Sequence, residues 1–295
     1  MTATVTEATT AAQPGMAGRK RQPSGHRRNV LGGLSGWIWL GIIILPIYYV
    51  VISSVKDQAG FFATNPLLPT MNPTFANYQL VLEAGFSRYF LNSVIVTIGT
   101  VVPSLLFAFM ASYAIVRGHG RFISFSNGVF LMGLAIPLQA TIVPIYLIIT
   151  RLNLYDTLWA LILPSAAFAL PISVLILANF MRDIPSGLFE SMRLDGATNW
   201  AILWQLVLPM TRPALVTVGI YNALHVWNAF LFPLILTQSE EKRVLPLSLW
   251  TFQGEFSINV PATLAAVVLS TLPLLVLYMV GRRQLVSGLT AGFSK

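Results

Sequence analysis

The side chains with the most chemistry to offer here are polar groups set within an apolar stretch. Tyr221, Asn222, His225 and Asn228 lie between residues 213 and 236, at spacings of one, three and three residues. On a helix they share one face. A phenol, two amides and an imidazole donate and accept hydrogen bonds without a fixed charge, which suits an uncharged solute rich in hydroxyl groups. We therefore expect these residues to line a solute pathway.

A second interpretation stays open for the same residues. Amide and imidazole groups also join membrane helices to one another, so the set could form the seam between this chain and a second membrane subunit instead of a pathway. Gln139, between Pro137 and Pro144, is a further candidate for the pathway.

Reaction chemistry finds little support in the sequence. Cysteine is absent, and we find no paired carboxylates within apolar stretches, no Ser/His/Asp set and no His-Glu-x-x-His. His26 and His119 are isolated. The phosphate-binding pattern Gly-x-x-x-x-Gly-Lys-Ser/Thr is also missing. We expect no catalytic residue, no metal site and no cofactor held by this chain.

The composition indicates a polytopic membrane protein. Of 295 residues, 55% are apolar and only 9% charged, against roughly a quarter charged in soluble domains. The net charge of +8 comes from basic residues near the ends of apolar runs, where they signal orientation in the membrane, so we expect no nucleic-acid partner.

Six apolar runs are long enough to span a membrane as helices, since a span takes about 20 residues. They cover residues 34–55, 90–116, 124–150, 157–181, 213–236 and 262–282. The fold class is therefore all-α. Placing both termini in the cytoplasm puts most of the 18 Lys and Arg on that side, as the positive-inside rule requires.

The chain divides into three parts on this interpretation. Residues 1–30 form a disordered, basic cytoplasmic tail, residues 31–285 form the transmembrane domain, and residues 286–295 form a C-terminal cytoplasmic tail. The loop after the fourth span, residues 182–212, is too long for a simple turn.

That loop predicts a short helix outside the membrane. Pro185 ends what precedes, Ser186 can cap a new helix, and Asp195-Gly196 ends it with glycine in the left-handed conformation. We expect Leu188, Phe189 and Met192 on one side, with Glu190 and Arg193 toward water. Thr198 can cap a further segment, Asn199 to Leu208, which stops before Pro209.

Two turns of helix are not stable alone in water, so this one must dock against something. It could rest as a lid on its own helix bundle. Alternatively, it could sit in a groove of another, soluble protein.

The spacing of Glu190, Gly196 and the ending Leu206-x-Leu208-Pro209 resembles the EAA loop of permease subunits of ATP-binding-cassette importers. That pattern runs EAA, three residues, Gly, nine residues, I-x-L-P. This chain departs from it at Ser191 and Met192, where the family prefers Ala-Ala, and at Leu206, where it prefers Ile. The resemblance makes residues 184–209 the coupling loop, whose ATPase-contacting residues would be Leu188, Phe189, Glu190, Met192, Arg193, Asp195, Gly196 and Ala197.

Further motifs over residues 34–295 look like the carbohydrate-uptake branch of these importers, in its maltose-permease kind of subunit. They are Tyr89-Phe90-Leu91-Asn92-Ser93, Ala135-Ile136-Pro137-x-Gln139, Leu152-x-Leu154-Tyr155-Asp156-Thr157-Leu158, Trp227-Asn228-x-Phe230 and Ser287-Gly288-Leu289-Thr290-Ala291-Gly292. One departure is Ala229, where the family often has an acid. The resemblance also implies a second ATPase contact in the tail, at Gly288, Leu289, Thr290 and Gly292.

The resemblance implies the fold and partners of a type I importer permease in a bacterial plasma membrane. A second permease would complete the pathway, two ATPase subunits would bind ATP and Mg, and an extracellular binding protein would deliver a sugar. A self-sufficient channel or secondary carrier is the alternative. Proton- or sodium-driven carriers usually need buried carboxylates, whereas Asp and Glu fall only in the tail and connectors here.

Overall fold

The computed structural model describes residues 30–252 and 258–291. The chain divides into two compact units, Met1–Leu45 and Pro46–Lys295. Within the first unit the described residues form the beginning of helix α1 (Val30–Ser54). The expected tail at 1–30 lies outside the described residues except for Val30, which already belongs to α1. All other elements belong to the second unit.

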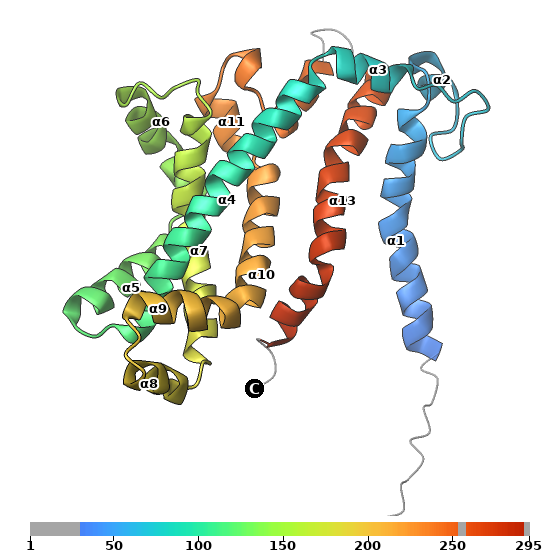
Figure 1. The fold of residues 1–295 in the computed structure, drawn as a ribbon. Coiled ribbons are helices and arrows are strands. Elements are labelled where there is room, and N and C mark those ends of the chain that lie inside the picture. Colours follow the sequence, from blue (N-terminus) through green and yellow to red (C-terminus); the bar gives the residue numbers. More distant parts are fainter. Residues whose placement is uncertain (1–29, 253–257, 292–295) are drawn as a thin grey trace, which may run out of the picture. The chain divides into compact units, whose positions relative to one another are not determined.

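Every regular element of the described residues is a helix (Figure 1). The four remaining long helices are α4 (Phe86–Arg117), α7 (Trp159–Arg182), α10 (Leu208–Trp227) and α13 (Val260–Ala291). The shorter α-helices are α2 (Gln58–Ala63), α3 (Ala76–Glu83), α5 (Arg121–Leu134), α6 (Ile142–Arg151), α8 (Ser186–Leu194), α9 (Asn199–Ile202), α11 (Leu231–Leu236) and α12 (Leu245–Ser248). The 3₁₀ turns are η1 (Leu138–Thr141), η3 (Glu240–Lys242) and η4 (Leu249–Phe252), and η2 (Leu203–Val207) is a π-helical turn.

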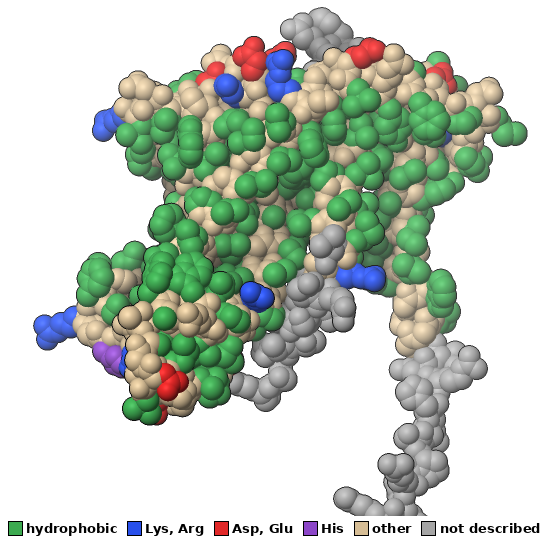
Figure 2. Space-filling view, in the orientation of Figure 1, with side chains coloured by type: hydrophobic (Ala, Val, Ile, Leu, Met, Phe, Trp, Pro, Cys, Tyr) green, Lys and Arg blue, Asp and Glu red, His purple; other side chains and the backbone are tan. Residues whose placement is uncertain are grey.

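The helices have the length and hydropathy of a multi-pass membrane protein. Five are apolar and long enough to span a bilayer, and the bent pair α5–α6 passes the same test only when its two helices are taken together as one span, which gives the six that the sequence predicts. In the second unit, charged side chains gather at two opposite ends and hydrophobic ones cover the surface between them (Figure 2). One end carries α8 and α9, and the other carries α3 and α11 (Figure 1).

The third span differs from the single helix predicted over residues 124–150. It consists of α5 and α6, which meet at an angle of 101°. Pro137 lacks an amide hydrogen and cannot continue the hydrogen-bond ladder of α5, and it disfavours helical geometry at Ile136. At the break, Gly133 lies so close to α7 that an added Cβ would come within 2.8 Å of Pro171.

The fifth span also begins earlier than predicted. The expectation that the segment from Asn199 stops before Pro209 is wrong, because α9, η2 and α10 form one helical run, Asn199–Trp227. The amide of Leu208 donates to the carbonyl of Leu203, a five-residue π step. Such a wide turn accommodates the proline that follows it, at the start of α10.

The core is built around α4 and α7, which run parallel to each other: Ser104 of α4 lies beside Ala166 of α7, and Ser112 lies beside Val174. Ser112 Oγ donates to the carbonyl of Val174 at 3.1 Å, so a buried hydrogen bond joins the two helices. A core cluster beside it includes Phe109, Leu177 and Val218, from α4, α7 and α10 respectively. The three helices are thereby held together along their length.

Candidate functional site

Helix α8 begins one residue earlier than the sequence predicts. Ser186 is its first residue, Pro185 occupies the N-cap position, and no side chain caps the helix. The prediction that Ser186 caps it is therefore wrong. Pro185 has extended geometry (φ −56°, ψ 131°) and its carbonyl accepts from the amide of Leu188, so it makes the turn that leads into the helix.

The end of α8 is the one predicted. Gly196 has a φ of +82°, in the left-handed region. Its amide donates to the carbonyl of Arg193 at 3.0 Å, and the amide of Ala197 donates to that of Met192 at 2.9 Å. These two bonds make a Schellman motif, which glycine favours because it has no Cβ. Thr198 then caps α9 by accepting from the amide of Ala201, as predicted.

Helix α8 has two faces with different roles. Phe189 is 2% exposed and, with Met192, packs into the chain's own core. Leu194 is 89% exposed, and Glu190 is exposed beside it. The inner face therefore rests on the chain's own bundle, while the outer face is open to another molecule.

This arrangement revises the expected partner-facing set. Phe189 and Met192 hold α8 to its own chain, whereas Glu190, Arg193, Asp195 and Leu188, which is 40% exposed, remain accessible. Leu194 is not among the partner-facing residues expected from the sequence. The helical period gives the signal, because Leu194 falls opposite the side of Phe189 and Met192.

The C-terminal candidates are only partly described. Gly288, Leu289 and Thr290 continue the backbone of α13, which ends at Ala291. Gly292 lies outside the described residues.

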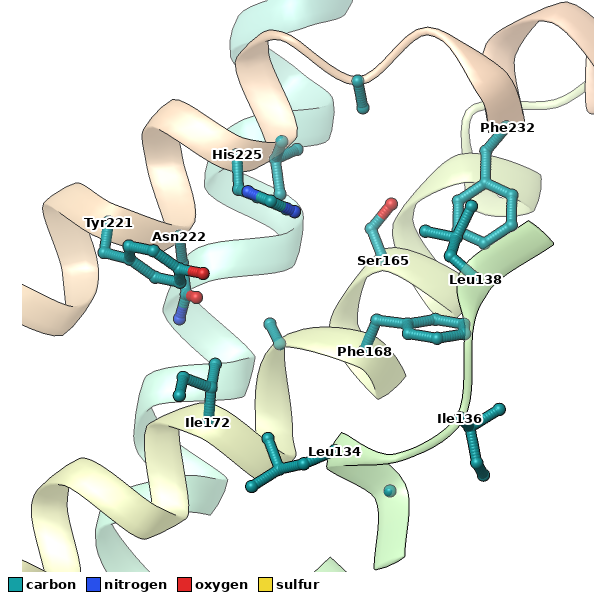
Figure 3. A pocket seen from close by; sticks show the side chains of 14 residues that line it. Leu134, Ile136, Leu138, Ser165, Phe168, Ile172, Tyr221, Asn222, His225 and Phe232 are labelled. Carbon is teal, nitrogen blue, oxygen red and sulfur yellow. The ribbon is translucent and has the colours of Figure 1, made fainter. Parts of the chain in front are cut away.

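A cavity of about 280 Å³ lies between α5, α7 and α10. Tyr221 and His225 of α10 stand on one wall, and Ser165 and Phe168 of α7 face them across the space (Figure 3). The break after α5 supplies the remaining side, through Leu134 and the residues that follow it.

A larger open hollow of about 690 Å³ shares Tyr221 and His225 with this cavity and adds Gln139 and Asn228. The rings of Tyr221 and His225 are stacked, with centroids 5.7 Å apart. The structure thus brings together four of the five predicted pathway residues. None of the residues that line the two spaces is Asp, Glu, Lys or Arg.

Asn222 belongs to the smaller cavity but is also a link between helices. It is 2% exposed, and its Nδ2 donates to Ser173 Oγ of α7 at 2.8 Å. This hydrogen bond joins two helices of one chain, and the alternative, a seam between two subunits, stays a prediction. Ser165 and Phe168 are not among the residues expected from the sequence, because their position at the cavity depends on where α5 breaks.

Two of the sequence motifs hold the segment between α11 and α12. Asn92 Nδ2 donates to the carbonyls of Glu241 and Arg243, both at 2.8 Å. Ser93 Oγ accepts from the amide of Leu245 at 2.9 Å. The beginning of α4 thus fixes this segment through side chains.

Asp156 fixes the other end of that segment. Its Oδ1 accepts from the amides of Gln238 and Ser239 at 2.9 and 3.0 Å and from Ser239 Oγ at 3.1 Å. Burial raises the pKa of this carboxyl, but the three hydrogen bonds outweigh burial and hold the pKa below its ordinary value. Asp156 therefore acts as a charged anchor for the α11–α12 segment.

Known proteins of one family are similar to this chain over most of its length. The family described as "Binding-protein-dependent transport system inner membrane component" matches residues 80–290. A Caldicellulosiruptor protein named as an ABC transporter permease is 38% identical over 258 residues, which is 88% of this chain and 94% of that protein. The diacetylchitobiose uptake system permease protein NgcG of Streptomyces coelicolor is 33% identical over 260 residues, covering 86% of this chain and 85% of the relative.

The fold has a solved counterpart. The crystal structure of a bacterial ABC transporter involved in the import of the acidic polysaccharide alginate contains a chain that matches with a TM-score of 0.76 at 23% identity. The match covers 89% of this chain and 99% of the other.

Proposed function

This chain belongs to the family of inner membrane components of binding-protein-dependent transport systems, and from that premise we propose that its solute is a sugar or an oligosaccharide. The permease would form half of the translocation pathway and couple it to a partner ATPase. The two regions described above correspond to these two tasks.

The observation that carries the solute proposal is the pair of joined hollows beside α10. Their polar groups are three amides, an imidazole, a phenol and a serine hydroxyl, set among aromatic rings. Such groups bind hydroxyls without requiring a charge on the solute. The diacetylchitobiose uptake permease among the relatives supports the same class.

The break between α5 and α6 supports a wet pathway at the same place. Gly133 lies against Pro171, near the middle of the 24-residue helix α7. Non-helical backbone at membrane depth is tolerated only inside protein or beside water, because its carbonyls need partners. The smaller cavity, which Gly133 and Leu134 line at the break, is the place where we propose that water lies.

The coupling proposal rests on the exposed face of α8, with Glu190 and Leu194 available to an ATPase groove. Phosphate-binding loops of the Walker type are absent from the sequence, so a partner would bind ATP and Mg. The same proposal places both termini and α8 in the cytoplasm, since most basic residues would then lie inside. An extracellular binding protein would deliver the solute at the opposite end.

Purification and reconstitution test the proposal. The tagged chain should co-purify with a second permease and an ATPase, and vesicles holding this complex should take up sugar only with ATP and a loaded binding protein. Solute flux through the chain reconstituted alone would instead favour a channel or a secondary carrier.

A further inference from the structure

Helix α8 is joined to α4 through a cation and a ring. The guanidinium carbon of Arg117, in the last turn of α4, lies 4.1 Å from the centroid of the Phe189 ring. Phe189 is 2% exposed, so this contact is shielded from water. A cation over an aromatic face is attracted by the ring quadrupole, and the attraction is stronger when it is desolvated.

The surroundings of Arg117 give it no competing charged partner. Among the residues that the structure describes, no acidic side chain forms a salt bridge with it, and its Nε is buried without a hydrogen-bond partner. The guanidinium is therefore positioned against the ring and not by a carboxylate. Its positive charge also suits the carbonyl end of α4.

Helix α4 continues this connection toward the solute hollows. Phe109 of α4 packs against Trp204 of η2, with ring centroids 5.8 Å apart, so the residues on both sides of Gly196 contact α4. Ser112 Oγ joins α4 to α7 through the carbonyl of Val174. Helix α7 in turn carries Ser165 and Phe168, which line the smaller cavity.

We propose that Arg117 is a positioning residue for transport, which keeps α8 attached to α4 while α8 is moved by the ATPase. A guanidinium is attracted anywhere over the ring within about 6 Å of its centroid, so the contact survives small sliding movements that would break a hydrogen bond. It thus transmits a displacement of α8 to α4 and then to α7. The inference rests on the proposed coupling of α8 to an ATPase.

The experiment uses the complete transporter in vesicles and measures sugar taken up per ATP hydrolysed. In Arg117→Gln and Phe189→Leu we expect normal ATPase co-purification and a loss of roughly tenfold in uptake per ATP, the range that removal of a desolvated cation–π contact gives. Phe189→Tyr keeps a ring face and should restore coupling. Arg117→Lys keeps the charge and should lie between Gln and the wild type.

Arg182→Gln is the matched control. Arg182 occupies the last turn of α7, as Arg117 does of α4, but it donates to Asn179, and it stacks on no aromatic ring of residues 30–252 or 258–291. The inference is overturned if uptake per ATP in Arg117→Gln equals that of the wild type, or if Arg182→Gln lowers it equally. If Phe189→Leu fails to assemble, the uptake per ATP of Arg117→Gln and Arg117→Lys still tests the inference. A wild-type complex without ATP-dependent uptake would instead refute the proposed function.

Discussion

The side-chain amide of Asn222 on α10 donates a hydrogen bond to Ser173 Oγ on α7, with 2.8 Å between the two atoms. Both residues are almost fully buried, and Ser173 Oγ donates onward to the carbonyl of Ala169. The two helices that form facing walls of the smaller cavity are thus tied together by side chains. The Asn222–Ser173 pair therefore stabilises the contact between α10 and α7, next to the cavity.

Asn222→Ala should therefore lower the free energy of unfolding by about 1 kcal/mol, the scale of hydrogen bonds between membrane helices. Ser173→Ala should have a similar effect, and the double variant should lose less than the sum of both, because the two changes remove one bond. Thermal unfolding in detergent measures this cycle. Ser126→Ala, at a half-buried position on α5 whose hydroxyl bonds only within its own helix, is the control, and strictly additive losses would show that the pair is not coupled.

Asp156 predicts a pH dependence at the α11–α12 segment. Its pKa is lowered in the folded chain, so its hydrogen bonds stabilise the fold fully above the ordinary Asp value of about 3.9. As the pH falls through that value toward the lower folded pKa, the unfolded chain takes up the proton first and the stabilisation is lost.

We expect Asp156→Asn to be less stable than the wild type near neutral pH and to approach it below about pH 4. Melting temperatures of the detergent-solubilised protein at a series of pH values measure the difference. Asp57→Asn, which alters the N-cap of α2, serves as a comparison at a separate anchor. A difference between Asp156→Asn and the wild type that stays constant from neutral to acid pH would contradict the charged anchor.

The shared wall of the two hollows predicts where solute affinity is sensitive. His225→Ala removes the one imidazole that lines both spaces, and Gln139→Ala removes an amide from the larger one. Each should lower uptake at subsaturating solute by roughly tenfold, as the loss of a hydrogen bond or two to a neutral solute does. Met210→Ala, on the same helix and 44% exposed, should leave uptake unchanged.

Initial rates over a range of concentrations of loaded binding protein measure this effect in the complete complex. Unchanged uptake in His225→Ala at all concentrations would remove this residue from the pathway. Asn222 provides an internal comparison, since its variant is expected to change stability first.

The elements of this fold follow from the sequence where a long apolar run is uninterrupted. The fourth span, predicted over 157–181, is α7 within two residues at either end. The third and fifth spans were less predictable because a proline in an apolar run can either break the helix or be accommodated within it. Pro137 breaks its helix at 101°, whereas Pro209 is absorbed by a π turn. Which outcome occurs depends on packing against α7 and α4, which a single sequence does not display.

The residues of the site were likewise predictable only in part. Polar residues at helical spacing predicted that Tyr221, His225 and Asn228 come together, and they do. Ser165 and Phe168 could not be predicted in this way, because a single serine or phenylalanine is common in an apolar helix. The helix stop at Gly196 was predictable from local geometry alone, since only the backbone conformation decides it.

Gly196 gives the sharpest test of the coupling loop. Its φ of +82° strains any residue with a Cβ, yet a Cβ there would meet nothing within 4 Å, so substitution acts on the backbone and not by a clash. Gly196→Leu should destabilise the Schellman turn by about 1–2 kcal/mol and tilt α8, with the membrane helices intact. We expect ATP hydrolysis to become uncoupled from uptake, or the ATPase to dissociate.

Two companion variants separate the backbone effect from side-chain size. Gly196→Asn should keep much of the coupling, because asparagine tolerates left-handed geometry better than leucine. Gly187→Ala, within α8 and also free of neighbours within 4 Å, should be neutral or slightly stabilising, since alanine favours a helix. Uptake and ATPase co-purification are measured for all three. Normal uptake in Gly196→Leu would mean that the left-handed stop after α8 does not position the coupling helix, and the assignment of residues 184–209 would have to be abandoned.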